Sequence, residues 1–415
     1  MAEAAALPTT TSLPATEGRN GFAATIVAGH ALKHTLISSV ASVIIPEIKL
    51  SLSLSATQVG TLGTTQQLTG WLATMSAGYL GDRFTHRTGL MLAFSLGMSG
   101  ASLLVMSLAP SYGVILIAML LMGFGPSMFH PPAVGALSRR FADRRSFAVS
   151  LHGTGGSIGE VCGPLIGAGL LALLYWRDVL RVEFIPALVG AFLMWKLLDS
   201  SRRADQPPDA GASSIGAYLS SFAGLLRQRA LVMLFGVAGL RAVGQAVTTV
   251  FLPIYLREDL GYSSVLVGSF IAMSQLAGIA SQPIMGIFAD RFGHKAVILP
   301  ALLCFAGLLA LVPLAENKLQ LALVILAIGC FIFSMQSILT SAAIELAGDR
   351  FHSTVTSLVY AAGFIGSLAP TAAGILADAH GLKITFLFSA TAVLLAACLL
   401  ALTRIPRHER RIETV

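Results

Sequence analysis

The sequence has little charge. Only 11% of its 415 residues are Asp, Glu, Lys or Arg, and the mean hydropathy is +0.78. Soluble domains carry about 25% charged residues, so this chain has too little polar surface to cover a core of its size. The composition excludes a soluble globular protein and predicts a protein embedded in a lipid bilayer.

Cysteine is scarce as well. The four cysteines lie within apolar segments and lack the spacing of metal ligands: Cys162, Cys304, Cys330 and Cys398. Such cysteines are typical small packing residues. We expect neither a disulfide framework nor a cysteine-ligated metal.

Long apolar segments fill the chain. Twelve of them have roughly the 20 residues that a membrane-spanning helix needs: 22–45, 57–80, 88–108, 112–137, 147–174, 179–198, 230–256, 263–288, 296–314, 319–345, 354–377 and 383–403. The sequence therefore predicts an all-α membrane protein. The sixth segment is flanked by Arg181 and Glu183, which makes it less uniform than its neighbours.

One long polar interval, 199–229, separates the sixth segment from the seventh. It predicts a cytoplasmic linker between two six-helix bundles, 22–198 and 230–403. Residues 1–21 have no basic start ahead of the first apolar run, which favours a disordered cytoplasmic tail over a cleaved signal peptide. Residues 404–415 form a second cytoplasmic tail.

Basic residues gather on one side of this topology. With the N-terminus in the cytoplasm, 19 of the 27 Lys and Arg residues face inward and 6 face outward. Both termini are therefore expected in the cytoplasm of a bacterial inner-membrane protein. This distribution also explains the net charge of +7, so no nucleic-acid partner is implied.

A charged loop occurs twice, half a chain length apart. Gly78-Tyr-Leu-Gly-Asp82-Arg83-Phe-Thr-His-Arg87 matches Gly286-Ile-Phe-Ala-Asp290-Arg291-Phe-Gly-His-Lys295. A similar register relates Ser127-Met128 to Ser334-Met335 and Gly156 to Gly363. The chain is therefore a duplication, with pseudo-symmetric bundles around a central cavity.

These loops resemble the signature of the major facilitator superfamily, and the resemblance covers essentially the whole chain. Gly156, Gly163, Pro164 and Gly167 resemble the helix 5 motif of drug/proton antiporters. Phe129-His130-Pro131, with His30 and Arg241, resembles the fosmidomycin-resistance branch. The resemblance implies a transporter and not an enzyme. It also implies efflux linked to antibiotic resistance, and a monomer.

In that family the duplicated loop is thought to latch the two bundles on the cytoplasmic side. The resemblance assigns a gating role to Asp82, Arg83 and Arg87, and to Asp290, Arg291 and Lys295. The alternative is a basic loop that only fixes topology.

Buried cations indicate where a ligand binds. His30, Lys33 and His34 share one face of the first segment, and Arg241 aligns with Lys33 in the second half. Charges within a membrane segment face a cavity or a partner. We predict that Lys33 and Arg241 bind an anionic substrate from opposite walls. His30, His34 and His130 are predicted to contact the same substrate. The alternative for Lys33 is a structural ion pair with Glu160. No metal site is expected, because Lys33 would repel a cation at His30 and His34.

Proton coupling is predicted at Glu160, His34 and His130, with the proton gradient as energy source and no cofactor. His34 stands where the branch usually carries an acid, and an imidazole titrates near neutral pH. His130 precedes Pro131-Pro132, which should interrupt the fourth helix. Helix packing is the alternative for His130.

The polar residues within the membrane segments of the second half are mostly uncharged. Gln245, Gln275 and Gln336 are predicted to bind the substrate, with interhelical packing as the alternative for Gln275 and Gln336. The sequence thus predicts a proton-coupled exporter of small anionic drugs or metabolites such as phosphonates. A symporter or facilitator that imports an organic anion is the alternative, and a receptor or membrane enzyme is less well supported.

Overall fold

The computed structural model describes residues 18–199, 227–332, 334–347 and 352–403, and in these ranges it is helical with no strand. Most of the predicted linker (200–226) and of the two tails (1–17 and 404–415) lies outside the described residues.

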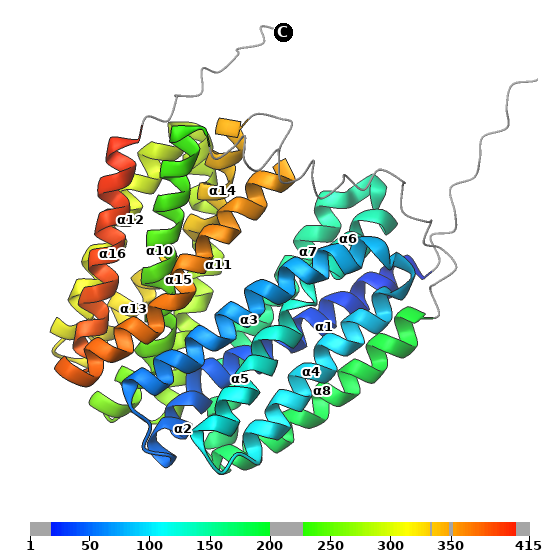
Figure 1. Cartoon of the computed structure of the whole chain (residues 1–415), viewed down its shortest axis with the longest axis horizontal. Helices are drawn as coiled ribbons and strands as arrows, with labels where there is room; N and C mark the ends of the chain where they lie inside the picture. Colours follow the sequence, from blue (N-terminus) through cyan, green and yellow to red (C-terminus); the bar gives the residue numbers. More distant parts are fainter. Residues whose placement is uncertain (1–17, 200–226, 333, 348–351, 404–415) are drawn as a thin grey trace, which may run out of the picture.

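Two groups of helices make up the described chain (Figure 1). The first bundle contains α1 (Arg19–Ser39), α2 (Ile45–Ser51), α3 (Ala56–Arg83), α4 (Thr88–Ser107), α5 (Tyr112–Ser127), α6 (His130–Arg140), α7 (Arg145–Leu171) and α8 (Trp176–Asp199). The second bundle contains α10 (Arg229–Ile254), α11 (Ser264–Phe292), α12 (His294–Leu311), α13 (Lys318–Ile332), α14 (Ser334–Ala347), α15 (His352–His380) and α16 (Lys383–Leu402). Short π-helical turns, Val40–Ile44 and Tyr255–Asp259, follow α1 and α10.

Nine helical segments of the described chain are long and apolar enough to cross a membrane. The helices α3, α7 and α8 have 28, 27 and 24 residues, which is also enough for a span. They are more polar: α3 is rich in Thr and Gln, α7 contains Glu160, and α8 carries Arg181 and Glu183. Nine of the twelve expected spans are thus matched by length and composition, and the other three by length.

Two local features are set by particular residues. The fourth segment breaks where its prolines predicted, because α5 ends at Ser127 and α6 begins at His130. The sixth segment begins slightly earlier than expected, at Trp176, and Glu183 lies within α8 and not at its flank. Glu183 is buried and accepts a hydrogen bond from Ser39 Oγ at 2.6 Å.

Glycines bring α7 against α1. A Cβ atom on Gly159 would lie 2.2 Å from the carbonyl oxygen of Ala31, and one on Gly163 would lie 2.5 Å from that of Thr35. Only glycine permits this backbone contact between membrane helices. The close approach holds the ionisable residues of α1 and α7 next to each other.

The two bundles meet at one end of the molecule, which we call the joined end. There α3 packs against α15 and α7 packs against α11. Toward the other end, where α1 begins and α16 ends, the two bundles spread apart (Figure 1). We call this the spread end.

Candidate substrate cavity

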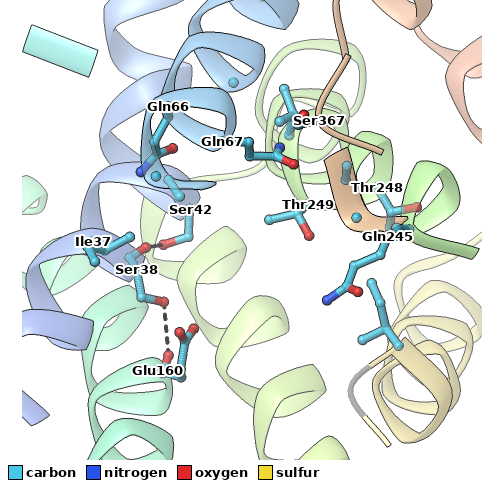
Figure 2. Close-up of a pocket in the computed structure, with 18 of the residues that line it drawn as sticks. Ile37, Ser38, Ser42, Gln66, Gln67, Glu160, Gln245, Thr248, Thr249 and Ser367 are labelled. Carbon is cyan, nitrogen blue, oxygen red and sulfur yellow. Dashed lines mark hydrogen bonds between the residues drawn. The ribbon is translucent and has the colours of Figure 1, made fainter. Parts of the chain in front are cut away.

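A cavity of about 730 Å³ lies between the bundles and is lined by both of them. The first-bundle wall comes from α1, α3, α5, α6 and α7, and the second-bundle wall from α10, α11, α13, α14 and α15. Most of the predicted substrate residues line it: Lys33, His34, His130, Arg241, Gln245, Gln275 and Gln336. Figure 2 shows several polar side chains around this space.

Lys33 and Arg241 line this cavity from different bundles, and each side chain is only 2% exposed. Lys33 Nζ lies 2.7 Å from His130 Nε2. Arg241 donates from Nη1 to the carbonyl oxygen of Ile332 (3.1 Å) and from Nη2 to Gln336 Oε1 (2.6 Å). A cation from each bundle is thus held at the wall of a single space.

Glu160 of α7 connects the two walls. Its Oε1 lies 2.6 Å from His34 Nδ1, and its Oε2 accepts a hydrogen bond of 3.0 Å from Gln275 Nε2 of α11. Its main-chain oxygen accepts from Ser38 Oγ at 3.0 Å (Figure 2). An ion pair between Lys33 and Glu160 was one reading of the sequence. Within the described residues, Lys33 makes its direct contact with His130, and Glu160 makes its ion-pair contact with His34; Lys33 and Glu160 interact through their charges without a direct contact.

Four histidines cluster behind and within the first-bundle wall. His34 and His130 line the cavity, whereas His30 is buried behind them and does not. The rings of His30 and His152 stack with centroids 3.7 Å apart, and His30 Nδ1 donates to the carbonyl oxygen of His152 at 2.7 Å. His30 therefore supports this wall in the present conformation, and its expected contact with a substrate is not made there.

The same cluster is the part of the described chain where histidines come closest to a metal-binding arrangement. One ring nitrogen from each of His30, His34 and His130 lies within 4.8 Å of the others. Lys33 Nζ already contacts His130 Nε2, and its charge opposes a second cation. We therefore assign no metal to these residues.

Glutamines on α3 were missed by the sequence analysis. Gln66 and Gln67 line the cavity beside Ser42, and Gln282 of α11 lines it opposite. The polar run Thr64-Thr-Gln-Gln67 inside an apolar helix was the signal available for the first two.

Backbone contacts close the joined end in a symmetric way. A Cβ atom on Gly60 of α3 would lie 2.1 Å from the carbonyl oxygen of Pro370 in α15. One on Gly268 of α11 would lie 2.4 Å from the carbonyl oxygen of Pro164 in α7. Each bundle therefore offers one glycine to a proline-containing helix of the other bundle. The helix 5 motif splits accordingly, with Gly156, Gly163 and Gly167 facing α1 and Pro164 facing α11.

Charged contacts add to this closure. Glu47 Oε1 lies 2.5 Å from Arg257 Nε, and Lys49 Nζ lies 2.5 Å from Glu258 Oε2. The carboxylate of Asp378 accepts hydrogen bonds from the main-chain nitrogens of Ala56 (2.7 Å) and Thr57 (2.9 Å), at the start of α3. A negative charge at a helix N-terminus is favourable.

The duplicated loops lie at the spread end. Arg83 and Arg87 face the ring of Phe84, and Arg291 faces that of Phe292. Lys295 Nζ donates to the carbonyl oxygens of Ala401 and Thr403, at the end of α16. Asp290 is exposed, and the side chain of Asp82 lies outside the described part of the structure. These recorded partners all belong to the residue's own bundle, so a latch between the bundles remains a prediction.

A family model described as Major Facilitator Superfamily matches residues 31–370 and 234–414. The chain belongs to the major facilitator superfamily. It is 26% identical to the uncharacterized MFS-type transporter YfnC of Bacillus subtilis over 85% of this chain and 87% of that one. It is 25% identical to the fosmidomycin resistance protein of Escherichia coli over 89% and 90%.

Among solved structures, a bacterial homolog of the human lysosomal transporter Spinster, inward-facing and unoccupied, has a TM-score of 0.74. It is 16% identical, and the match covers 94% of this chain and 97% of that one. The predicted all-α membrane fold and family are thereby confirmed, as is the inference that the chain is a transporter and not an enzyme.

Proposed function

We propose that this secondary transporter exports small organic anions from the cytoplasm in exchange for protons, by alternating access to the cavity between its bundles. The observation that carries the proposal is the pair Lys33 and Arg241, two buried cations that line one cavity from different bundles. An anion that binds both would also draw the two bundles together.

The surroundings of Lys33 support an anionic cargo. A buried cation costs several kcal/mol unless an opposite charge compensates it. The side chain that contacts Lys33 directly is a histidine, and the nearby carboxylate of Glu160 makes its hydrogen bonds with His34 and Gln275 instead. A carboxylate, phosphonate or phosphate group of the cargo would supply a negative charge in direct contact with Lys33.

Glu160 and His34 are the proposed proton-binding pair, with His130 beside them. An ionised Glu160 accepts hydrogen bonds from His34 in its own bundle and from Gln275 in the other. A proton on Glu160 would weaken the contact with Gln275 and so favour separation of the bundles at the joined end. This links a proton to the exchange between conformations.

The distribution of basic residues supports a membrane orientation with the spread end in the cytoplasm. The present conformation is then inward-facing, as is the solved Spinster homolog. Closing the spread end would bring the loops of Asp82 and Asp290 toward each other, while the contacts of Glu47 and Asp378 would open. The direction of export draws on the helix 5 motif and on the relative named for fosmidomycin resistance.

An anion/proton symporter is the second candidate. It is favoured by one observation, the position of Glu160 and His34 on the same wall as Lys33. Protonation of either group makes that wall more positive, which strengthens the binding of an anion. Proton and anion would then cross together.

Purified protein in liposomes tests the anion site with a panel of phosphonates, carboxylates and neutral drugs. We expect transport of the anions to fall in Lys33→Met and in Arg241→Gln, and to persist in Lys318→Met, a control at an exposed lysine. Equal transport of neutral and anionic compounds, unchanged by both cavity substitutions, would refute the anion site.

A further inference from the structure

Six glutamines line the cavity. Gln66 and Gln67 come from α3, Gln245 from α10, Gln275 and Gln282 from α11, and Gln336 from α14. Two of them already form hydrogen bonds with other side chains: Gln275 donates to Glu160, and Gln336 accepts from Arg241. The other four side-chain amides form no hydrogen bond with another described residue, although each reaches the cavity.

The four uncommitted amides belong to both bundles. Figure 2 shows Gln67 and Gln245 pointing from opposite sides toward the space between them, with Thr249 and Ser367 nearby. Within a membrane, a polar side chain without a protein partner must be satisfied by water or by a ligand. A simple acid would need fewer than four such groups to orient it in the cavity.

An amide and a hydroxyl group are complementary. The amide offers an oxygen acceptor and an NH₂ donor, and an alcohol likewise donates and accepts. An ionised carboxylate or phosphate group only accepts hydrogen bonds, and Lys33 and Arg241 are already available to donate them. A hydrocarbon or aromatic body that displaced water from the amides would leave them unpaired, which costs about 1–3 kcal/mol for each group that it buries.

We propose that the cargo is a polyhydroxylated organic anion, such as a sugar acid or a sugar phosphate, whose hydroxyl groups bind the uncommitted glutamines while its acid group binds Lys33 and Arg241. This inference rests on the proposed anion site and specifies the class of substrate. The cavity of about 730 Å³ has room for a six-carbon acid together with water. Lipophilic anions without hydroxyl groups are then poor substrates.

Matched pairs of anions test this in proteoliposomes. Gluconate is compared with hexanoate, and glycerol 3-phosphate with propyl phosphate, as competitors of labelled gluconate. Each pair shares its charge and chain length and differs in hydroxyl groups. We expect at least one hydroxylated member to compete at about 100-fold lower concentration than its partner, because a site built to bind hydroxyls rejects analogues that lack them.

Substitutions of single glutamines then test which side chains recognise the hydroxyl groups. Gln67→Leu and Gln245→Leu should each reduce the discrimination between the paired anions by about tenfold, while Gln320→Leu, at an exposed position of α13, should leave it unchanged. Protein amount and monodispersity are checked for each variant. Because the readout is a ratio between two compounds on one protein, a partial loss of folded transporter does not imitate the effect.

Several outcomes would overturn the inference. One is equal competition within both pairs, which would refute hydroxyl recognition but leave the proposed anion site unaffected. Another is discrimination that Gln67→Leu and Gln245→Leu both leave intact. If Arg241→Gln leaves the transport of every anion unchanged, the proposed anion site itself fails, and this inference fails with it.

Discussion

The two walls of the cavity differ in the kind of charge that they carry. On the first-bundle wall, Lys33, His34, His130 and Glu160 can all gain or lose a proton. On the second-bundle wall, Arg241 is the charged residue among the described lining residues, and amides and hydroxyls surround it. A guanidinium stays protonated in proteins. Under the proposed mechanism, the first-bundle wall changes its charge during a cycle, while Arg241 keeps a constant positive charge on the second-bundle wall.

This asymmetry arose on a symmetric scaffold. The joined end is closed by equivalent contacts, Gly60 against Pro370 and Gly268 against Pro164. Packing thus follows the duplication while the chemistry of the walls does not. A transporter that exchanges a proton for an anion needs one titrating site, and it needs both bundles to hold the cargo.

The largest effect is expected when Arg241, the charged residue of the second-bundle wall, is replaced. Arg241→Gln should weaken anion binding by about 30-fold or more, since loss of one partner of a buried charge pair costs about 2–5 kcal/mol. Arg241→Lys should recover part of it, limited by the lost contacts to Gln336 and Ile332. Binding is measured by calorimetry in detergent. Unaltered affinity in both variants would show that the second wall needs no cation.

Next in size is the loss of Glu160, the carboxylate proposed to bind the proton. Glu160→Gln keeps the shape of the side chain but cannot ionise, so a pH gradient should no longer drive anion flux, while exchange of anion for anion continues. Flux is followed with labelled anion in liposomes. A Glu160→Gln transporter that still responds to the pH gradient would place the proton elsewhere.

The position of the carboxylate can be tested by exchange. Glu160→Gln combined with Gln275→Glu moves the acid to the second wall and keeps a partner across the bundles. We expect no recovery of coupling, because His34 then lacks its carboxylate neighbour. Full recovery would mean that a carboxylate on either wall can couple transport to protons, and that the difference between the two walls is not needed for coupling.

A smaller effect is expected from the contact between the walls. Gln275→Leu removes a hydrogen bond to a charged group, worth about 1.5–3 kcal/mol, so separation of the bundles should depend less on the proton at Glu160, and flux driven by a pH gradient should fall by about tenfold. Gln320→Leu is the matched control at an exposed site. Coupled flux equal to wild type in Gln275→Leu would remove this contact from the cycle.

The smallest effect is expected at the spread end. Asp82→Asn should lower transport by up to about fivefold, in keeping with the 0.2–1 kcal/mol of an exposed ion pair, and leave the amount of protein in the membrane unchanged. Asp290→Asn, at the equivalent loop, is the comparison. If the two variants transport like wild type, the loops determine topology only.

Much of the fold was predictable, because a membrane span is a local property of about 20 residues. The break before His130 is equally local, whereas the α7 glycines contact residues of α1 that are far away in the sequence. Glu183 was misjudged as a flank although it falls within the predicted range 179–198, because the sequence does not show that Ser39 of α1 would pair with it inside the bundle.

The site was less accessible to sequence reasoning. Helical spacing indicated that His30 and His34 share a face, but not that His130 and His152 from other helices complete the cluster. Nor did it indicate that His30 lies behind the wall. Contacts such as Glu47 with Arg257 join residues of different bundles, and no local pattern specifies them.

Proton-coupled exchange of an anion can be distinguished from symport by one flux measurement. Liposomes hold the transporter and the same concentration of labelled anion inside and outside, and the outside is then made acidic. Exchange for protons predicts that the anion inside falls below its outside concentration, with no such change in Arg241→Gln. Accumulation inside the liposomes would contradict exchange and establish symport, and an unchanged distribution would contradict proton coupling altogether.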